Sequence, residues 1–203
     1  MPATQTIPPP SDERLRRTSP LRRVLGHPEL GAVAGTVVVW LFFALVAGER
    51  GFLTLAGTAT YLEVAAELGI LAVAVTLLMI GGEFDLSVGS LIGASGMLLT
   101  ILSVQYGWPL GAALVAVLAF AVAAGLANGY LVVRTGLPSF IVTLATLFVF
   151  RGATIGLTRL LTGRTQLGGL RDVAGFDLAH ALFASELVVS GARFPVSILW
   201  WLG

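Results

Sequence analysis

Long apolar runs divide the chain, and most charged residues fall between them. Leu30–Gly48 is apolar for 19 residues, and Leu86–Val133 continues for 48 residues without a charged side chain. One helical crossing of a bilayer needs about 20 apolar residues. The longer run therefore predicts two spans, at about 86–105 and 110–133. The turn at 106–109, Tyr-Gly-Trp-Pro, separates them, since Tyr and Trp favour the headgroup layer and Pro suits a first helical turn.

A further span precedes this run. We predict it at Leu62–Gly82, because the uncharged part alone, Leu68–Gly82, is too short to cross. This choice places Glu63 and Glu67 in the first two turns, on one face of the helix. Carboxylates there are stabilised by the helix dipole, and the alternative is a role in a polar pathway.

The segment after the second long run permits two interpretations. Pro138–Phe150 is 13 residues long before Arg151 interrupts it. Either a fifth span continues to about 157, or 138–157 is a broken or re-entrant helix lining a cavity. A polar loop at 163–193 follows, in which 178–189 predicts a short amphipathic helix. The final ten residues, 194–203, predict the start of a sixth helix and suggest a fragment of a longer protein.

These elements predict an all-α fold, a polytopic transmembrane helical bundle with about five spans plus the start of a sixth. The composition agrees: 56% of the 203 residues are hydrophobic, only 11% are charged, and the mean hydropathy is +0.92. A soluble domain has about twice this charged fraction. We predict two regions, a disordered basic cytoplasmic tail at 1–29 and a transmembrane domain at 30–203. A cleaved signal peptide is the less favoured alternative for the first helix.

The sequence gives no sign of an enzyme or a metal site. There is no cysteine, and His27 and His180 are isolated from other ligands. No nucleotide-binding motif and no nucleophile–base pair is visible, so we predict no catalytic residue, no metal and no cofactor bound by this chain. The formal net charge of +1 does not favour nucleic acid as a partner.

The stretch Gly81–Ser90, GGEFDLSVGS, places two carboxylates between apolar spans. Two glycines make a helix end natural there. Asp85 then suits the start of the next span, where its carboxylate accepts backbone N–H bonds. Glu83 is expected in a solvated turn, and Ser87 is expected to bond the backbone of the first turn. The alternative places all three in a wet translocation path, because a charge at mid-bilayer costs at least about 2.5–3.5 kcal/mol.

Other polar residues of the spans are candidates for the same path. Asn128, near the inner end of the fourth span, is expected to hydrogen-bond another helix, with pathway lining as the alternative. Phe140 and Arg151 share one helical stripe, and Thr143 and Thr146 lie on an adjacent one. Threonines in helices usually bond back to their own backbone, so contact with a solute is the second interpretation for them.

Three stretches together resemble a known family: GGEFDLSVGS at 81–90, GLANGYLVVRTGLPSFIVTLATLFVFRG at 125–152, and LLTG at 160–163. In order and spacing they are similar to permease subunits of bacterial ABC importers of the ribose, galactose and xylose type. The resemblance covers about 61–163. Glu83-Phe84 departs from the commoner family form, which has one residue between the glycines and the aspartate.

This resemblance implies a permease dimer in the bacterial inner membrane, with the N-terminus in the cytoplasm. It also implies a cytoplasmic ATP-binding subunit that uses ATP and a periplasmic sugar-binding protein that docks on the loop 163–193. The gate or path candidates are Glu83, Asp85, Ser87, Asn128, Phe140, Thr143, Thr146 and Arg151. The family's coupling segment in its second half is absent from these residues, which predicts a partial or split permease. The alternatives are half of a secondary transporter or channel, using its carboxylates, and an inactive fragment.

Overall fold

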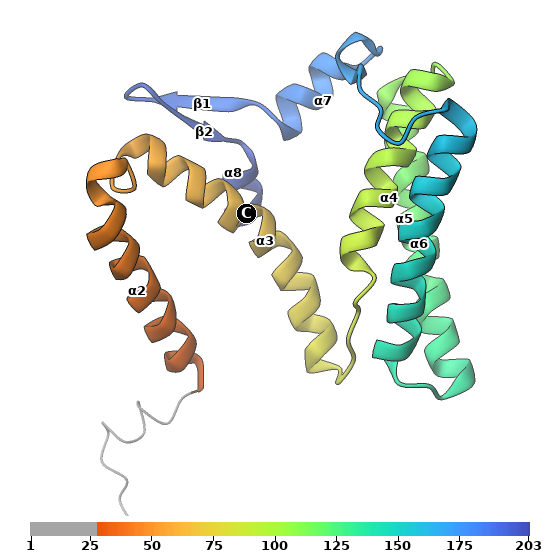
Figure 1. Cartoon of the computed structure of the whole chain (residues 1–203), viewed down its shortest axis with the longest axis horizontal. Helices are drawn as coiled ribbons and strands as arrows, with labels where there is room; N and C mark the ends of the chain where they lie inside the picture. Colours follow the sequence, from red (N-terminus) through yellow and green to blue (C-terminus); the bar gives the residue numbers. More distant parts are fainter. Residues whose placement is uncertain (1–27) are drawn as a thin grey trace, which may run out of the picture. The chain divides into compact units, whose positions relative to one another are not determined.

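The computed structural model describes residues 28–203, so the predicted tail at 1–29 lies outside it except for its last two residues. Within the described residues the fold is helical, and five helices are long and apolar enough to cross a membrane (Figure 1). The predicted polytopic helical class is confirmed. The chain divides into two units between Thr54 and Leu55.

The first unit is built on α2, Pro28–Ala47, which agrees with the first predicted span. A 3-10 turn at Gly48–Arg50 follows, and Gly51 ends it with a φ of 102°, a conformation that glycine adopts without strain. Phe52 then folds back on the helix, where its ring centroid lies 6.1 Å from that of Trp40. Apolar side chains are exposed on all sides of α2, as expected for a helix that faces lipid.

The second unit begins with α3, Leu55–Ile80, and here the predicted span started seven residues too late. The extra turns contain small and polar uncharged residues, and Thr60 Oγ1 donates to the Ala56 carbonyl oxygen at 3.0 Å, which satisfies its hydroxyl within the helix. Glu63 and Glu67 consequently lie in the third and fourth turns. The prediction that they anchor the helix start was wrong, and Glu67 is near the middle of the span.

Three further spans form a bundle (Figure 1). They are α4, Val88–Thr100, which a π-helical turn extends to Gln105; α5, Leu110–Thr135; and α6, Ser139–Thr162. The first two confirm the predicted spans at 86–105 and 110–133. The third is one continuous helix, so the full-span interpretation holds and the broken helix is excluded. Helices α4 and α6 run in the same direction, and α5 is antiparallel to both.

Glycines end two helices of this bundle. Gly136 follows α5 with a φ of 68°, and its N–H donates to the Val132 carbonyl at 2.9 Å. Gly163 follows α6 with a φ of 72° and bonds to Arg159 in the same way. Such left-handed residues close a helix by satisfying one of its free carbonyl groups. The two glycines therefore determine where α5 and α6 end.

The remaining residues form short elements. They include a 3-10 turn at Leu170–Asp172, then α7, Phe176–Phe183, and the antiparallel strands β1, Glu186–Val189, and β2, Ala192–Pro195. The predicted helix at 178–189 was therefore wrong in its second half. Ser190 and Gly191, both at positive φ, make the tight hairpin turn that right-twisted strands favour. The last element is α8, Ser197–Leu202, which packs with β2 on α3.

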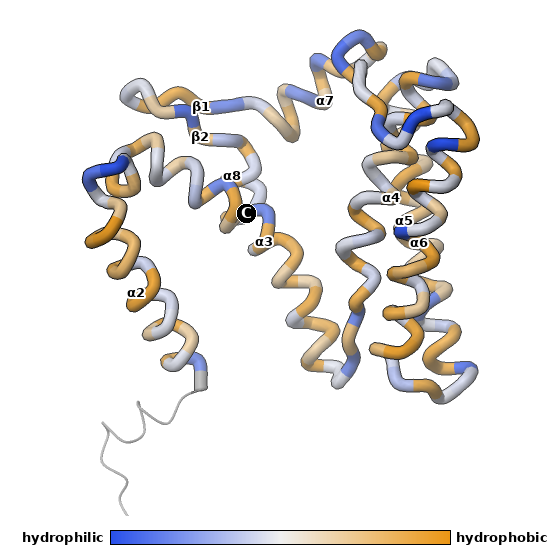
Figure 2. The backbone as a smooth tube through the Cα atoms, in the orientation of Figure 1, coloured by the Kyte–Doolittle hydropathy of each residue, from blue (hydrophilic) through white to orange (hydrophobic). Residues whose placement is uncertain are grey.

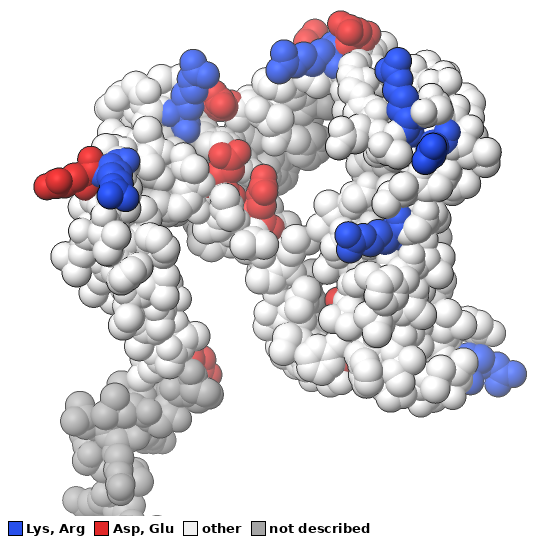
Figure 3. Space-filling view, viewed as in Figure 1, with Lys and Arg blue, Asp and Glu red and all other residues white. Residues whose placement is uncertain are grey.

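Apolar side chains cover most of the surface of the long helices. Figure 2 shows hydrophobic residues along them and hydrophilic residues mainly at turns and around α7. Figure 3 shows few charged side chains, several of them in small groups, on a largely uncharged surface. Buried residues in the spans are mostly small, such as Ala66 and Ala113 at 0% exposure. This is the pattern of helices packed closely inside a membrane.

Candidate functional site

The segment that joins α3 to α4 is not helical. Helix α3 ends at the glycine pair, where the N–H of Gly82 donates to Met79 at 3.0 Å and Gly82 has a φ of 81°. Residues 83–86 are then non-helical, and α4 begins after Ser87. We call residues 83–87 the crossover. The predicted helix break at Gly81-Gly82 is confirmed.

Two side chains of α6 satisfy the crossover backbone. The N–H of Phe84 donates to Ser139 Oγ at 2.9 Å, and the N–H of Leu86 donates to Thr143 Oγ1 at 3.1 Å. Both acceptors are buried, and Thr143 Oγ1 donates in turn to the Ser139 carbonyl at 2.9 Å. Extended backbone lacks the internal hydrogen bonds of a helix, so these two hydroxyl groups replace them.

Asp85 and Ser87 close the crossover onto the start of α4. Asp85 Oδ1 accepts the N–H of Ser87 at 2.7 Å and the Ser87 hydroxyl at 2.6 Å. The prediction that Asp85 caps this helix was wrong, because Ser87 occupies the N-cap position; the Asp85 carboxylate instead accepts the N–H of Ser87 itself. The hydroxyl of Ser87 was expected to bond the first turn and instead bonds the carboxylate of Asp85.

Asn128 connects α5 to this cluster. Its Nδ2 donates to Ser87 Oγ at 3.1 Å, and the residue is 6% exposed. A hydrogen-bond chain therefore runs from the amide through the serine hydroxyl to the carboxylate of Asp85. The expected bond from Asn128 to another helix is confirmed. Its Oδ1 is buried and has no hydrogen-bond partner among the described residues.

A cavity of about 210 Å³ adjoins the crossover. Most of the polar residues just described line it, together with Glu83 and the backbone of two glycines of α5; the main lining residues are Glu83, Asp85, Gly125, Asn128, Ser139 and Thr143. Ser139 was not among the predicted path residues. It is the first residue of α6, after the N-cap Pro138, and its hydroxyl accepts from a residue 55 positions away, so no local signal in the sequence marks it.

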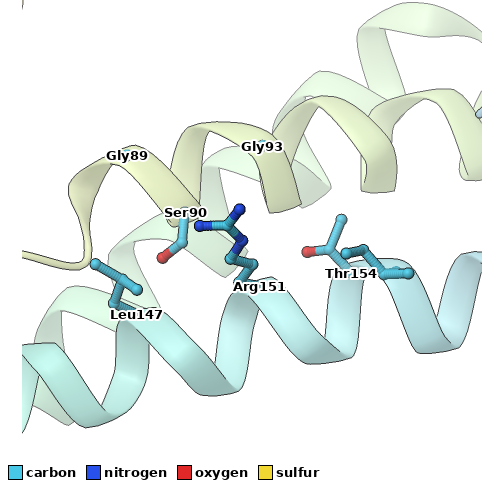
Figure 4. A pocket seen from close by; sticks show the side chains of 7 residues that line it. Gly89, Ser90, Gly93, Leu147, Arg151 and Thr154 are labelled. Carbon is cyan, nitrogen blue, oxygen red and sulfur yellow. The ribbon is translucent and has the colours of Figure 1, made fainter.

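The other predicted residues do not join this cluster. Phe140 is 49% exposed, and Thr146 Oγ1 donates to the Thr143 carbonyl of its own helix at 3.1 Å. Arg151 lines a separate cavity of about 370 Å³ between α4 and α6, shown in Figure 4. The structure thus brings together Glu83, Asp85, Ser87, Asn128 and Thr143, and it places Arg151 apart from them.

Within the described residues, no group of three or more His, Cys, Asp or Glu side chains is placed to hold a metal ion. The polar chemistry of the cluster is that of hydrogen bonding. One carboxylate, three hydroxyl groups and one amide hold three helices together around a non-helical segment. Five helices of the described residues are long and apolar enough to cross a membrane, so the molecule is a multi-pass membrane protein.

Comparison with known proteins identifies the class. The profile described as branched-chain amino acid transport system / permease component matches residues 57–202. The chain belongs to this family of transport-system permease components. This confirms the resemblance on which the sequence analysis relied, and members of such a family act as the membrane component of a transporter.

Relatives within the family are named for solutes other than amino acids. The chain is 37% identical over 126 residues to the xylose transport system permease protein XylH of Escherichia coli (strain K12), which covers 62% of this chain and 32% of the relative. It is 39% identical over 163 residues to XylH of Haemophilus influenzae, covering 80% of this chain and 42% of the relative.

The autoinducer 2 import system permease protein LsrD of Klebsiella pneumoniae is 32% identical over 141 residues, covering 66% of this chain and 41% of that protein. The chain thus spans less than half the length of these curated relatives. No solved structure matches the chain.

Proposed function

We propose that the chain is a membrane-spanning permease subunit of an ATP-driven importer, and that it forms part of the translocation path for a sugar. The family match and the relatives named for xylose support this function. The importer takes its sugar from a periplasmic binding protein and its energy from a cytoplasmic ATP-binding subunit. A second permease subunit, identical or related, completes the membrane part.

The observation that carries the proposal is the crossover. A non-helical segment between two spans is tolerated in a membrane protein where protein covers it or where it lines a cavity. Here Ser139 and Thr143 satisfy its backbone, and the cavity of about 210 Å³ lies beside it. Helices α3 and α4 are separate spans, and the polar segment between them lines the cavity, as non-helical backbone does at solute sites in transporters. Glu83, Asp85, Ser87, Asn128 and Thr143 are accordingly proposed to line or gate the path.

The proposed orientation places the N-terminus and the crossover on the cytoplasmic side. By the parity of the spans, residues 163–193 then face the periplasm and offer a docking surface to the binding protein. The chain lacks cysteine, so Phe84→Cys introduces a unique thiol in the crossover. Labelling by a membrane-impermeant maleimide is expected in inverted vesicles and absent in intact cells. Labelling in intact cells would place the crossover outside and overturn this topology.

Uptake of radiolabelled neutral sugars tests the function itself. Cells that express the complete importer, with its ATP-binding and binding-protein subunits, are compared with cells that lack only the gene for this chain. We expect uptake of one or more sugars to need the chain and to stop when ATP is depleted. Uptake that persists without ATP and stops when the proton gradient is collapsed would instead support a secondary transporter.

One observation favours that second candidate. Glu67 lies near the middle of α3 and is exposed there, and intramembrane carboxylates form proton and ion relays in coupled carriers. Replacing Glu67 with Gln separates the two mechanisms. A coupled carrier would lose its response to the proton gradient, whereas the ATP-driven importer keeps uptake under ATP-replete conditions.

A further inference from the structure

The second cavity, which we call the arginine groove, lies between α4 and α6 and has a volume of about 370 Å³. Gly89 and Gly93 form its α4 wall, and the side chains of Ser90, Arg151 and Thr154 border it. In Figure 4 the guanidinium group of Arg151 extends from α6 toward α4, between Ser90 and Thr154. The crossover is not part of its lining.

Arg151 lies deep in the span. It is near the midpoint of the 24-residue helix α6, about 16–18 Å from either end at the rise of an α-helix. Among the described residues no carboxylate forms an ion pair with it. A cation at mid-bilayer costs at least about 2.5–3.5 kcal/mol when lipid surrounds it. The guanidinium group therefore needs water or a polar ligand in the groove.

The hydrogen bonds of the two hydroxyl groups define what that ligand is. Ser90 Oγ donates its hydrogen to the Ser87 carbonyl at 2.8 Å, and Thr154 Oγ1 donates to the Phe150 carbonyl at 2.6 Å. Both hydroxyl hydrogens are thus directed to the backbone in this arrangement, and the oxygens present lone pairs that accept hydrogen bonds. Arg151 provides the opposite, five N–H donors and no acceptor.

Donors beside acceptors are complementary to hydroxyl groups, because each hydroxyl both donates and accepts. A carboxylate or phosphate would gain from Arg151 but would meet the lone pairs of Ser90 and Thr154. The glycines add space: a Cβ built at Gly89 or Gly93 meets no other atom within 4 Å. The α4 wall therefore lets a ring-shaped solute approach the helix backbone.

We propose that the arginine groove is a binding site for a neutral polyhydroxylated solute, with Arg151 as the hydrogen-bond donor and Ser90 and Thr154 as acceptors. This inference rests on the proposed function and names the contacts of the solute along the path. The groove discriminates against anionic solutes through the two acceptor oxygens. It is a second position on the path, separate from the crossover.

Cysteine labelling tests whether the groove contains water and binds sugar. Leu147→Cys, on the α6 wall of the groove, is expected to react with a charged methanethiosulfonate reagent at least about tenfold faster than Val122→Cys, which lies at mid-depth on α5, because thiols in apolar surroundings are held as unreactive neutral groups. The assay uses the assembled importer in membranes. D-xylose, D-ribose, D-galactose and L-arabinose are then added separately as protectants, with gluconate as the anionic comparison.

At least one of the four sugars is expected to slow labelling of Leu147→Cys, and gluconate is expected to have no effect. Adding Arg151→Lys to the same protein keeps the charge and removes the planar fork of donors. It should raise the half-protecting sugar concentration about tenfold, the equivalent of losing about 1.4 kcal/mol of binding. Unreactive Leu147→Cys, protection by gluconate alone, or no protection by any of the sugars would overturn the proposal.

A methyl group on the α4 wall gives an independent test without a reporter thiol. Gly93→Ala should lower sugar uptake at unchanged membrane abundance, because the methyl group projects into the groove without striking the protein. Gly156→Ala on α6 is the matched control, since a Cβ there also meets nothing within 4 Å and Gly156 does not line the groove. Equal uptake by both variants would count against a solute site at this wall.

These results separate the site from the importer. Protection by a sugar without ATP-dependent uptake would retain the site and reject the proposed function. ATP-dependent uptake that is unaffected by Gly93→Ala and Arg151→Lys, with no protection of the thiol, would retain the importer and reject the site.

Discussion

Removing one hydroxyl group from α6 provides the sharpest test of how the crossover is held. Thr143→Val keeps the shape of the side chain and removes its hydroxyl oxygen. In the parent chain this oxygen accepts a hydrogen bond from the Leu86 N–H at 3.1 Å. In the variant this N–H has no other acceptor on the extended segment. An unsatisfied buried donor costs about 1–3 kcal/mol. Polar contacts in membranes measure at the low end of such ranges, so we expect a loss of about 1 kcal/mol.

The matched control is Thr146→Val, one turn further along α6. Thr146 donates only to the Thr143 carbonyl of its own helix and contacts no crossover backbone, so its replacement should change stability by less than about 0.5 kcal/mol. Both variants are compared with the parent chain by reversible unfolding in mixed detergent micelles, followed by circular dichroism. The free energy of unfolding is the quantity compared.

Equal stability of the two variants would refute the reasoning. It would mean that water or another group satisfies the Leu86 N–H and that the α6 hydroxyl is not needed to hold the extended backbone. Ser139→Ala serves as a second measurement, because it removes the acceptor of the Phe84 N–H, bonded at 2.9 Å. Since both side chains hold one segment, the double variant should lose less than the sum of the two single losses.

Three further changes have defined outcomes. Asp85→Asn keeps an acceptor oxygen for the start of α4, so stability should change by less than about 0.5 kcal/mol; loss of uptake by this stable variant would assign the charge a role in transport. Asn128→Leu removes one interhelical hydrogen bond, which destabilises the fold, and also a buried oxygen that has no partner among the described residues, which stabilises it. The free energy of unfolding should therefore change by less than about 1 kcal/mol. A larger loss would show that Oδ1 has a partner in the assembled protein. Gly69→Ala would drive a methyl group into the Trp201 indole and should destabilise the chain by about 1–3 kcal/mol in the same unfolding assay. Gly111→Ala is the control, because its methyl group meets nothing within 4 Å and should not destabilise the chain. Equal stability of the two variants would show that α8 does not pack on α3.

The spans were predictable because each depends on a local property, the length of an uncharged apolar run. The end of α3 was also predictable, since two adjacent glycines disfavour helix. The start of α3 was not: residues 55–61 are uncharged and compatible with either loop or helix, and the nearest charges, Glu63 and Glu67, gave the wrong boundary. Their position inside the helix changes their meaning from surface anchors to intramembrane carboxylates.

Long-range contacts explain the other misses. Ser139 is 55 residues from its partner Phe84, and no local pattern reveals that pairing. The helix predicted over 178–189 failed because the periodicity of Glu186–Val189 is compatible with a strand, and the pairing of Leu187 with Phe194 decides the matter. Conversely, Arg151 interrupts the apolar run of the sequence, but it does not interrupt helix α6, because a helix tolerates a polar side chain that faces a groove.

The crossover and the arginine groove both lie between α4 and α6. The hydrogen bonds that hold the crossover therefore also affect the groove. The crossover attaches the start of α4 to the first turns of α6 through Ser139 and Thr143. The groove begins at Gly89, two residues beyond Ser87, and continues between the same helices to Thr154. The attachment therefore fixes the separation of α4 and α6 at one end of the groove. A change in the crossover would alter the width of the groove and hence the distance from Arg151 to its solute. A movement at the helix ends would in this way affect a site in the middle of the membrane.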